Sequence, residues 1–223
     1  MATNKNIQEP EVNVGEALSK TEKFFDTYKN HIIYGTAAII AVVVAVMLFH
    51  NFVTLPAQQE AMAQTYTAEQ YFRNGDFEKA LDGDGNALGF NQIISDYGTK
   101  AGEAVYFYAG VCELQLGNWE SAIKYLQAYN GKDAILAARA QACIGDAYVG
   151  LEDYSKALGY FEKAAATIDN MFAAGYLLKA GVVAEKLGEN AKALSFYEKI
   201  KDQYPQSMEA YDIDKYIGRI EAR

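Results

Sequence analysis

The hydrophobic residues of this chain follow two different patterns, and the first is a continuous apolar run. The eighteen residues from Ile32 to Phe49 contain no charged side chain. At a rise of about 1.5 Å per residue they make a helix about 27 Å long, which matches the hydrocarbon thickness of a bilayer. We therefore predict a transmembrane helix over residues 31–53.

A cleaved signal peptide is the main alternative to a retained anchor. Its apolar region usually has about 7–15 residues and ends at a small-x-small cleavage site. Here the run is longer, starts at residue 32, and is followed by His50 and Asn51. These features favour an uncleaved span, while a buried core helix stays open as a third alternative.

Lysines flank this span on one side. Lys20, Lys23 and Lys29 precede it, and the next Lys or Arg after it is Arg73. Because Lys and Arg are retained on the cytoplasmic side, the N-terminus is expected in the cytoplasm and the C-terminal part outside it.

Apolar residues at helical spacing also precede the span. They predict an amphipathic cytoplasmic helix over residues 14–30 that lies in the headgroup layer or docks on a membrane partner. Residues 1–13, which contain Glu9-Pro10-Glu11, indicate a flexible cytoplasmic tail. The apolar positions of the predicted helix are Val14, Ala17, Leu18, Thr21, Phe24, Phe25 and Tyr28.

The second pattern is a short motif that occurs four times. A turn residue is followed by an aromatic residue or its substitute, and then by an alanine three residues later. Repetition at a period near 35 residues predicts stacked helical hairpins, which usually bind other molecules. The four copies are Gly75–Leu81, Gly117–Ile123, Glu152–Leu158 and Gly188–Leu194, and their alanines, Ala80, Ala122, Ala157 and Ala193, lie 42, 35 and 36 residues apart.

A small residue stands twelve positions before each repeat alanine, at Ala68, Gly110, Gly145 and Gly181. With this spacing, residues 57–206 resemble four tetratricopeptide repeats. The resemblance implies an all-α fold, a right-handed superhelix of tetratricopeptide-type helical hairpins, which follows the N-terminal transmembrane helix predicted from the apolar run. It also implies that the small residues and the repeat alanines let the two helices of a hairpin pack closely, and that each second helix carries a large apolar residue further along. These large residues are Phe90, Leu126, Phe161 and Tyr197.

Several positions depart from this repeat pattern. Six extra residues, Asp82–Ala87, are expected to interrupt the second helix of the first unit. Phe77, Trp119 and Tyr154 are expected to start second helices, whereas Asn190 predicts a looser fourth turn. Residues 207–223 are expected to form a C-terminal capping helix, capped by Ser207, with an apolar stripe that covers the open end of the solenoid. That stripe comprises Tyr211, Tyr216, Ile217 and Ile220.

The composition argues against several kinds of chemistry. A formal net charge of −9 disfavours a nucleic-acid partner. Both histidines, His31 and His50, flank the span, so histidine-based catalysis and metal sites are not expected in the outward part. We predict no enzyme activity, no catalytic residues, no cofactor and no metal.

Two other chemical possibilities are weak. Asp82-Gly83-Asp84-Gly85-Asn86 matches the start of a calcium loop, but position six is Ala87 and position twelve is Ile93. Cys112 and Cys143 are expected as buried thiols, and a disulfide between neighbouring units is the alternative.

In tetratricopeptide repeats the first helices line a concave groove, and the matching positions here are largely apolar. The carboxylate clamp of the family, built from Lys and Asn, is not found at these positions. A hydrophobic segment or a partner helix therefore fits better than an acidic tail. The residues predicted for the partner-binding groove are Phe72, Phe107, Val111, Leu114, Val149, Leu178 and Val182. The alternative is that the solenoid's own terminal helices cover them.

The order of cytoplasmic helix, single span and outward repeat domain resembles the membrane-anchored ancillary repeat subunit of the bacterial Sec translocon. This resemblance implies a bacterial inner-membrane protein with a periplasmic repeat domain, whose protein partners are translocon subunits or a periplasmic chaperone. A scaffold for envelope assembly or cell-wall enzymes is one alternative. A subunit of an envelope stress-signalling complex is another.

Overall fold

The computed structural model describes residues 14–222, with side-chain environments from residue 22 onward. The described residues form helices and no strand, so the predicted all-α fold is confirmed. The chain divides into two compact parts, residues 1–55 and 56–223. The tail predicted over residues 1–13 lies outside the described residues.

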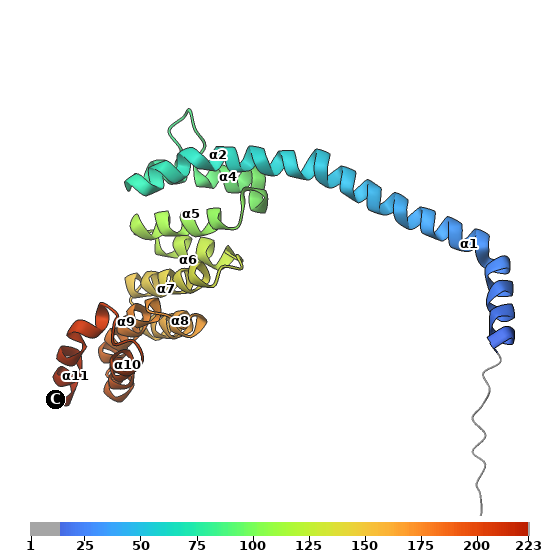
Figure 1. Ribbon diagram of the computed structural model, residues 1–223. Coiled ribbons are helices and arrows are strands. Elements are labelled where there is room, and N and C mark those ends of the chain that lie inside the picture. The colour runs from blue at the N-terminus through green and yellow to red at the C-terminus, as the bar shows by residue number, and fades with distance from the viewer. Residues whose placement is uncertain (1–13, 223) are drawn as a thin grey trace, which may run out of the picture. The chain divides into compact units, whose positions relative to one another are not determined.

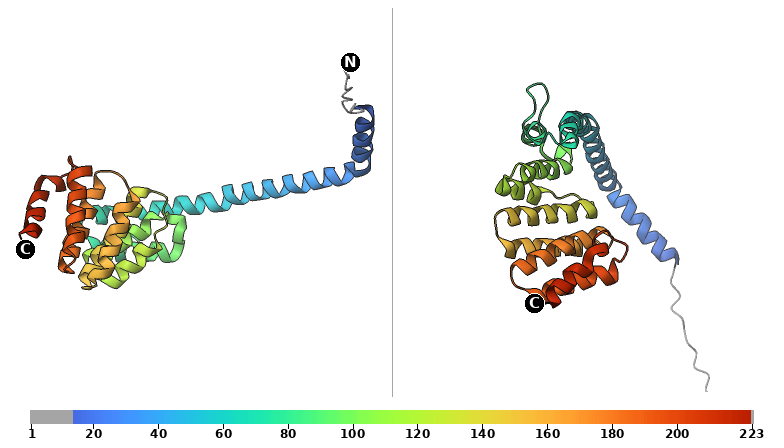
Figure 2. Two further views of the ribbon diagram at one scale, coloured as in Figure 1. Left: turned by 90° about the horizontal axis from the view of Figure 1, so that it is seen from below. Right: turned by 90° about the vertical axis from the view of Figure 1, so that its left-hand side faces the viewer.

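The first part is helical throughout its described length. Helix α1 spans Val14–Phe49, and a π-helical segment, η1, follows over His50–Thr54. The helix continues without interruption across the predicted border between an amphipathic helix and a separate span, although Figures 1 and 2 show that α1 bends sharply in its N-terminal part. The rings of Phe24 and Tyr28 lie 4.9 Å apart between centroids, as expected for residues four positions apart on one helical face.

Length and composition allow one helical segment of the described residues to cross a membrane. This segment is Glu22–Asn74, in which an 18-residue window has a mean hydropathy of 2.7 and none of that window is buried. Because signal sequences near an N-terminus meet the same criterion, the segment is a candidate span.

The second part consists of helical hairpins stacked in chain order, as Figures 1 and 2 show for the helices from α2 to α11. Together they form the predicted tetratricopeptide-type superhelix. The first helices of the four repeat units are α2 (Leu55–Asn74), α5 (Ala104–Gln115), α7 (Ala134–Gly150) and α9 (Phe172–Lys186). The second helices are α3 (Phe77–Asp82) with α4 (Phe90–Tyr97), then α6 (Trp119–Ala128), α8 (Tyr154–Thr167) and α10 (Asn190–Gln203).

Shorter elements complete this part. A 3₁₀ turn, η2 (Gly98–Ala101), follows α4. A second 3₁₀ turn, η3 (Glu209–Asp212), leads into the last helix, α11 (Ile213–Glu221).

Each hairpin turn has the same backbone hydrogen bonds. In unit two, Gly117 N–H donates to the Leu114 carbonyl over 3.2 Å, and Asn118 N–H donates to the Glu113 carbonyl over 2.9 Å. The turn residue has a positive φ in all four units, which is why glycine is favoured there. Unit three uses Glu152 instead, at φ 59°. The positive-φ glycines are Gly75, Gly117 and Gly188.

The close helix contact predicted at the small residues is present, and the structure shows that large residues of the second helices make it. A Cβ added to Gly110 would lie 2.6 Å from Cγ of Leu126, and one added to Gly145 would lie 2.7 Å from the Phe161 ring. Real Cβ atoms do not approach so closely, so the second helix fills the space that the glycine leaves. Phe77, Trp119 and Tyr154 are the first residues of their helices, which confirms the predicted starts.

A further close contact, which the sequence did not reveal, joins units two and three. A Cβ added to Gly150 would lie 2.6 Å from the indole ring of Trp119. Gly150 is the last residue of α7, so Trp119 packs against the first helix of the following unit. The bulky turn residue of one unit therefore also sets the spacing to the next.

The extra residues in unit one interrupt its second helix, as predicted. The carboxylate of Asp84 accepts hydrogen bonds from the backbone N–H groups of Asn86 and Ala87, at 2.9 and 2.7 Å, and from the Tyr71 hydroxyl at 2.8 Å. These hydrogen bonds lower the pKa of Asp84. The bond from Ala87 N–H contributes most, and those from Tyr71 and Asn86 contribute less. Protein donors thus account for the conformation of this loop.

Two details of the C-terminal region differ from expectation. Ser207 Oγ accepts from Ala210 N–H at 3.2 Å, but Ala210 lies in η3, and α11 starts only at Ile213. Tyr211, predicted in the apolar stripe, is 90% exposed because it lies in η3. Of the stripe, Ile220 is buried, and Tyr216 and Ile217 pack against the core.

The fourth turn is not looser than the others, contrary to the prediction from Asn190. Gly188 and Glu189 make the same two backbone hydrogen bonds as their equivalents in the other units. The backbone geometry is therefore set by the left-handed Gly188, not by the aromatic residue. Asn190 Oδ1 is buried and has no hydrogen-bond partner among the described residues.

Candidate protein-binding groove

Three adjoining cavities lie along the first helices of units two to four. The first, of about 250 Å³, is lined by Val111, Leu114, Arg139 and Tyr176 among others. The second, of about 280 Å³, shares Asp146 and Lys179 with it. The third, of about 470 Å³, shares three valines with the second, namely Val149, Val182 and Val183. We call this continuous surface the groove.

Five of the seven predicted partner-binding residues line these cavities. Val149 and Val182 are the most accessible, at 36% and 45% exposure, and both line the second and third cavities. Leu178 lines the second cavity. Val111, which is only 8% exposed, and Leu114 line the first.

Phe107 is buried, so its predicted place in the partner-binding groove is wrong. Its side chain is 3% exposed and packs against Tyr108 and Tyr129, with ring centroids 5.8 and 6.1 Å away. It belongs to the core shared by α5, α6 and α7. Its position on α5 faces the neighbouring helices instead of open solvent, so a partner has no access to it. The equivalent residue of unit three, Ala142, is buried as well.

Phe72 also does not line the groove. It is half-buried, with its ring 5.9 Å from that of Phe77 and 5.0 Å from that of Tyr108, between centroids. These contacts place Phe72 in an aromatic cluster between units one and two.

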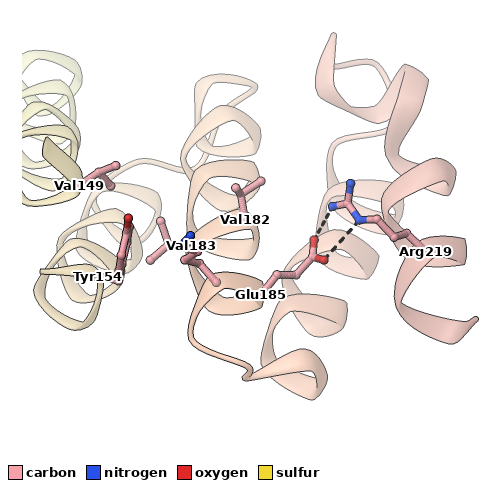
Figure 3. Close-up of a pocket in the computed structure, with 7 residues that line it drawn as sticks. Val149, Tyr154, Val182, Val183, Glu185 and Arg219 are labelled. Atoms are coloured by element: carbon pink, nitrogen blue, oxygen red, sulfur yellow. Dashed lines mark hydrogen bonds and ion pairs between the residues drawn. The ribbon is translucent and has the colours of Figure 1, made fainter. Parts of the chain in front are cut away.

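The C-terminal helix forms one wall of the groove. Figure 3 shows Arg219 of α11 pointing toward Glu185 of α9, beside Val182. Arg219 forms an ion pair with Glu185, whose side chain is only 9% exposed. Tyr216 of α11 lines the second cavity. The solenoid's own end therefore borders the groove, and Val149 and Val182 remain accessible.

Ion pairs connect the helices on both sides of the apolar strip of the groove, which consists of Val149, Leu178 and Val182. Lys179 Nζ of α9 donates to both carboxylate oxygens of Asp146 of α7, each at 2.7 Å. Glu185 additionally accepts a hydrogen bond from the Tyr197 hydroxyl at 2.8 Å. The sequence did not predict the ion pair between Arg219 of α11 and Glu185. The two residues are 34 positions apart, and no local pattern relates them.

The groove carries an excess of positive charge. Its linings contain four cations, Arg139, Lys179, Lys186 and Arg219, but only two carboxylates, Asp146 and Glu185. Both carboxylates are already paired. Among residues 22–222, Arg139 and Lys186 have no ion-pair partner, although Lys186 Nζ lies 5.6 Å from the centre of the Tyr154 ring.

Both cysteines are free thiols. Burial raises the pKa of Cys112 to about 12 and that of Cys143 to about 11, from an ordinary value of 9.0. Since the thiolate is the nucleophile, both groups are poorly activated at neutral pH. Cys143, which lines the first cavity, acts there as a small apolar side chain.

Comparison with known protein families supports the repeat assignment in two places. Residues 104–132 and 176–207 match the family model described as tetratricopeptide repeat. These segments contain α5 with α6, and most of α9 with α10. A search of curated proteins finds no match to the chain. Two segments of the chain therefore match the tetratricopeptide repeat, a class of module that typically acts as a protein-binding scaffold, and the other hairpins of residues 56–222 have the same helical architecture.

Proposed function

We propose that this protein is a membrane-tethered scaffold that binds a segment of a partner protein in the groove. The observation that carries the proposal is the exposure of Val149 and Val182 on the first helices of a tetratricopeptide solenoid. Exposed aliphatic side chains that line a continuous cavity lose water on binding, which favours association by roughly 25 cal/mol per Å² of apolar area buried.

The charges around the apolar strip restrict the partner. Arg139 and Lys186 lie in the first and third cavities, and neither is neutralised by an ion pair among the described residues. A segment with apolar side chains over Val149, Val182 and Leu178, and with acidic side chains toward these cations, is complementary to the groove.

The proposed tether is the span over residues 31–53. Lys20, Lys23 and Lys29 before it favour a cytoplasmic N-terminus and a repeat domain on the opposite side of the membrane. The assignment to a bacterial inner membrane and its periplasm rests on the resemblance of the domain order. The finer proposal, that the partner is a translocon subunit or a periplasmic chaperone, rests on the resemblance of the domain order alone.

Partner recovery by the full-length protein tests the groove. We expect the double variant Val149→Asp, Val182→Asp to lose the partner when the protein is purified from solubilised membranes. Both side chains are exposed, so the variant should melt at the temperature of the unmodified protein. Met62→Asp is the matched control, because Met62 of α2 is 59% exposed and does not line the groove.

The proposal is wrong if the folded double variant recovers the same partner in the same amount. The nature of the partner decides the finer proposal separately. Recovery of cell-wall enzymes or a signalling regulator, in place of translocon subunits or a chaperone, would retain the scaffold and refute its assignment to secretion.

A further inference from the structure

A second apolar surface lies outside the cavities of the groove. Four large side chains, Met171, Phe172, Met208 and Tyr211, are 56%, 55%, 87% and 90% exposed. We call them the edge patch. Single exposed apolar residues are ordinary on protein surfaces, but a contiguous group of large ones marks an interaction site.

Contacts between two loops bring these residues to one place. Met171, before α9, lines a cavity of about 430 Å³ with Gln203–Ser207, the segment that ends directly before Met208. The Tyr204 hydroxyl donates to Asp169 at 3.1 Å and so ties the two loops together. A carboxylate oxygen of Glu209 lies 3.1 Å from the place of a Cβ on Gly175, one helical turn after Phe172.

The core does not need the exposed side chains. Ala138, Ile168 and Ala173 are buried beneath this region and pack with Tyr176 and Tyr204. Neither Met208 nor Tyr211 belongs to a core cluster. Their exposure is therefore not explained by the packing of the solenoid.

The surroundings of the edge patch are acidic. Residues 168–175 and 201–215 contain five acids and two lysines, a net charge of −3. The lysines are already occupied, since Lys201 Nζ is 2.7 Å from Asp214 and Lys215 pairs with Asp212. Asp202 and Glu209 form no ion pair with any described residue. Such a surface repels anionic lipid headgroups and nucleic acids, and it attracts basic groups.

We propose that the edge patch docks a basic amphipathic helix of a partner protein. Methionine side chains adapt to the shape of an apolar helix face, and Phe172 and Tyr211 provide aromatic contact area. Lysine or arginine residues that flank this apolar face lie opposite Asp202 and Glu209. The surface and its partner chemistry are separate from those of the groove, which carries the opposite charge.

Photo-cross-linking of the full-length protein in native membrane vesicles tests this proposal. A p-benzoylphenylalanine residue replaces Met208 in one variant and Tyr211 in another, and a variant with the same residue at Met62 is the control. Sequencing of the cross-linked peptides should give basic segments with apolar residues at a spacing of three or four. Because opposite charges are screened by salt, the yield should fall several-fold between low and high salt.

Two charge variants sharpen the test. Asp202→Asn together with Glu209→Gln should lower the yield at position 208 several-fold, whereas Val149→Asp with Val182→Asp should leave it unchanged. The proposal is overturned if the cross-linked material is lipid, if the peptides are acidic, or if the yield does not exceed that of the Met62 control. Because each surface has its own variants, failure of the groove proposal can be told apart from failure of the edge-patch proposal.

Discussion

Tyr197 of α10 occupies the space that a side chain on Gly181 of α9 would need. A Cβ on Gly181 would lie 2.2 Å from Cε1 of the Tyr197 ring, the closest approach among the three repeat glycines that face a second helix. The ring is fully buried, and its hydroxyl donates to Glu185, which in turn pairs with Arg219 of α11. The missing side chain on Gly181 thus lets one tyrosine link both helices of unit four to the wall of the groove.

Gly181→Ala should destabilise the protein by about 1–3 kcal/mol, because an added methyl group overpacks the contact with a rigid ring. Thermal unfolding, followed by circular dichroism, measures this loss of stability. Gly159→Ala is the matched control, since nothing lies within 4 Å of a Cβ there and alanine is favoured in a helix by roughly 0.5–1 kcal/mol. Equal effects of the two substitutions would contradict the packing assigned to Gly181.

Arg219→Met should cost about 1–3 kcal/mol, because it removes the cation beside the nearly buried Glu185 carboxylate. The loss should appear first as increased hydrogen exchange in α11, measured by mass spectrometry. Lys215→Met is the control on the same helix, because both members of its pair with Asp212 are exposed and such pairs contribute about 0.5 kcal/mol or less. Protection of α11 that is unchanged in Arg219→Met would show that the ion pair does not hold the helix.

We expect the buried hydroxyl of Tyr197 to make the folded state less stable at alkaline pH. Burial, followed by the hydrogen bond to Glu185, raises the pKa of Tyr197 well above its ordinary value of 10.0. The unfolded state therefore loses this proton more easily than the folded state. The resulting stabilisation is complete below pH 10 and declines as the pH rises above 10 toward the folded pKa.

Tyr197→Phe isolates this contribution. It should lose about 1 kcal/mol at neutral pH through the missing hydrogen bond, and it should show a shallower decline of stability above pH 10. Urea unfolding at a series of pH values measures both effects. Burial also raises the pKa of Tyr125 and Tyr176, which both proteins retain, so the comparison cancels their contributions. Parallel pH profiles of the two proteins would contradict the assignment.

If residues 31–53 span the membrane as predicted, the repeat domain should be accessible to protease only from outside the cytoplasmic membrane. Protease added to intact spheroplasts should degrade the repeat domain after residue 56 and leave a short fragment that contains the anchor. The protein should also resist extraction from membranes by alkaline carbonate, because a helix with about 18 apolar residues is held by its hydrophobic contacts. A repeat domain that is cut only after the membrane is permeabilised would reverse the predicted orientation.

Local pattern was sufficient to predict most of the helical elements. Gly117 and Gly188 occupy turns that need a positive φ, and Trp119 and Tyr154 begin second helices as expected. Each of these features depends on residues within one hairpin, so their spacing along the chain is enough. Asn190 shows the limit of this approach, since the backbone of its turn did not depend on the missing aromatic residue.

The candidate site was predicted only in part, because exposure depends on neighbouring units. Phe107 and Leu178 occupy equivalent positions on α5 and α9, yet only Leu178 lines the groove. Arg219 joined the site from α11, a helix predicted only as a cover.

By itself, the sequence determined that this protein has an apolar segment long enough to span a bilayer, followed by hairpins at a period near 35 residues. Both properties depend on the order and spacing of nearby residues. The tertiary structure alone decided that Val149 and Val182 stay exposed, that Phe107 is buried, and that Glu185 meets Arg219. The physical reason is that helical spacing assigns a residue to a face, while the packing of the adjacent hairpin decides whether that face is covered.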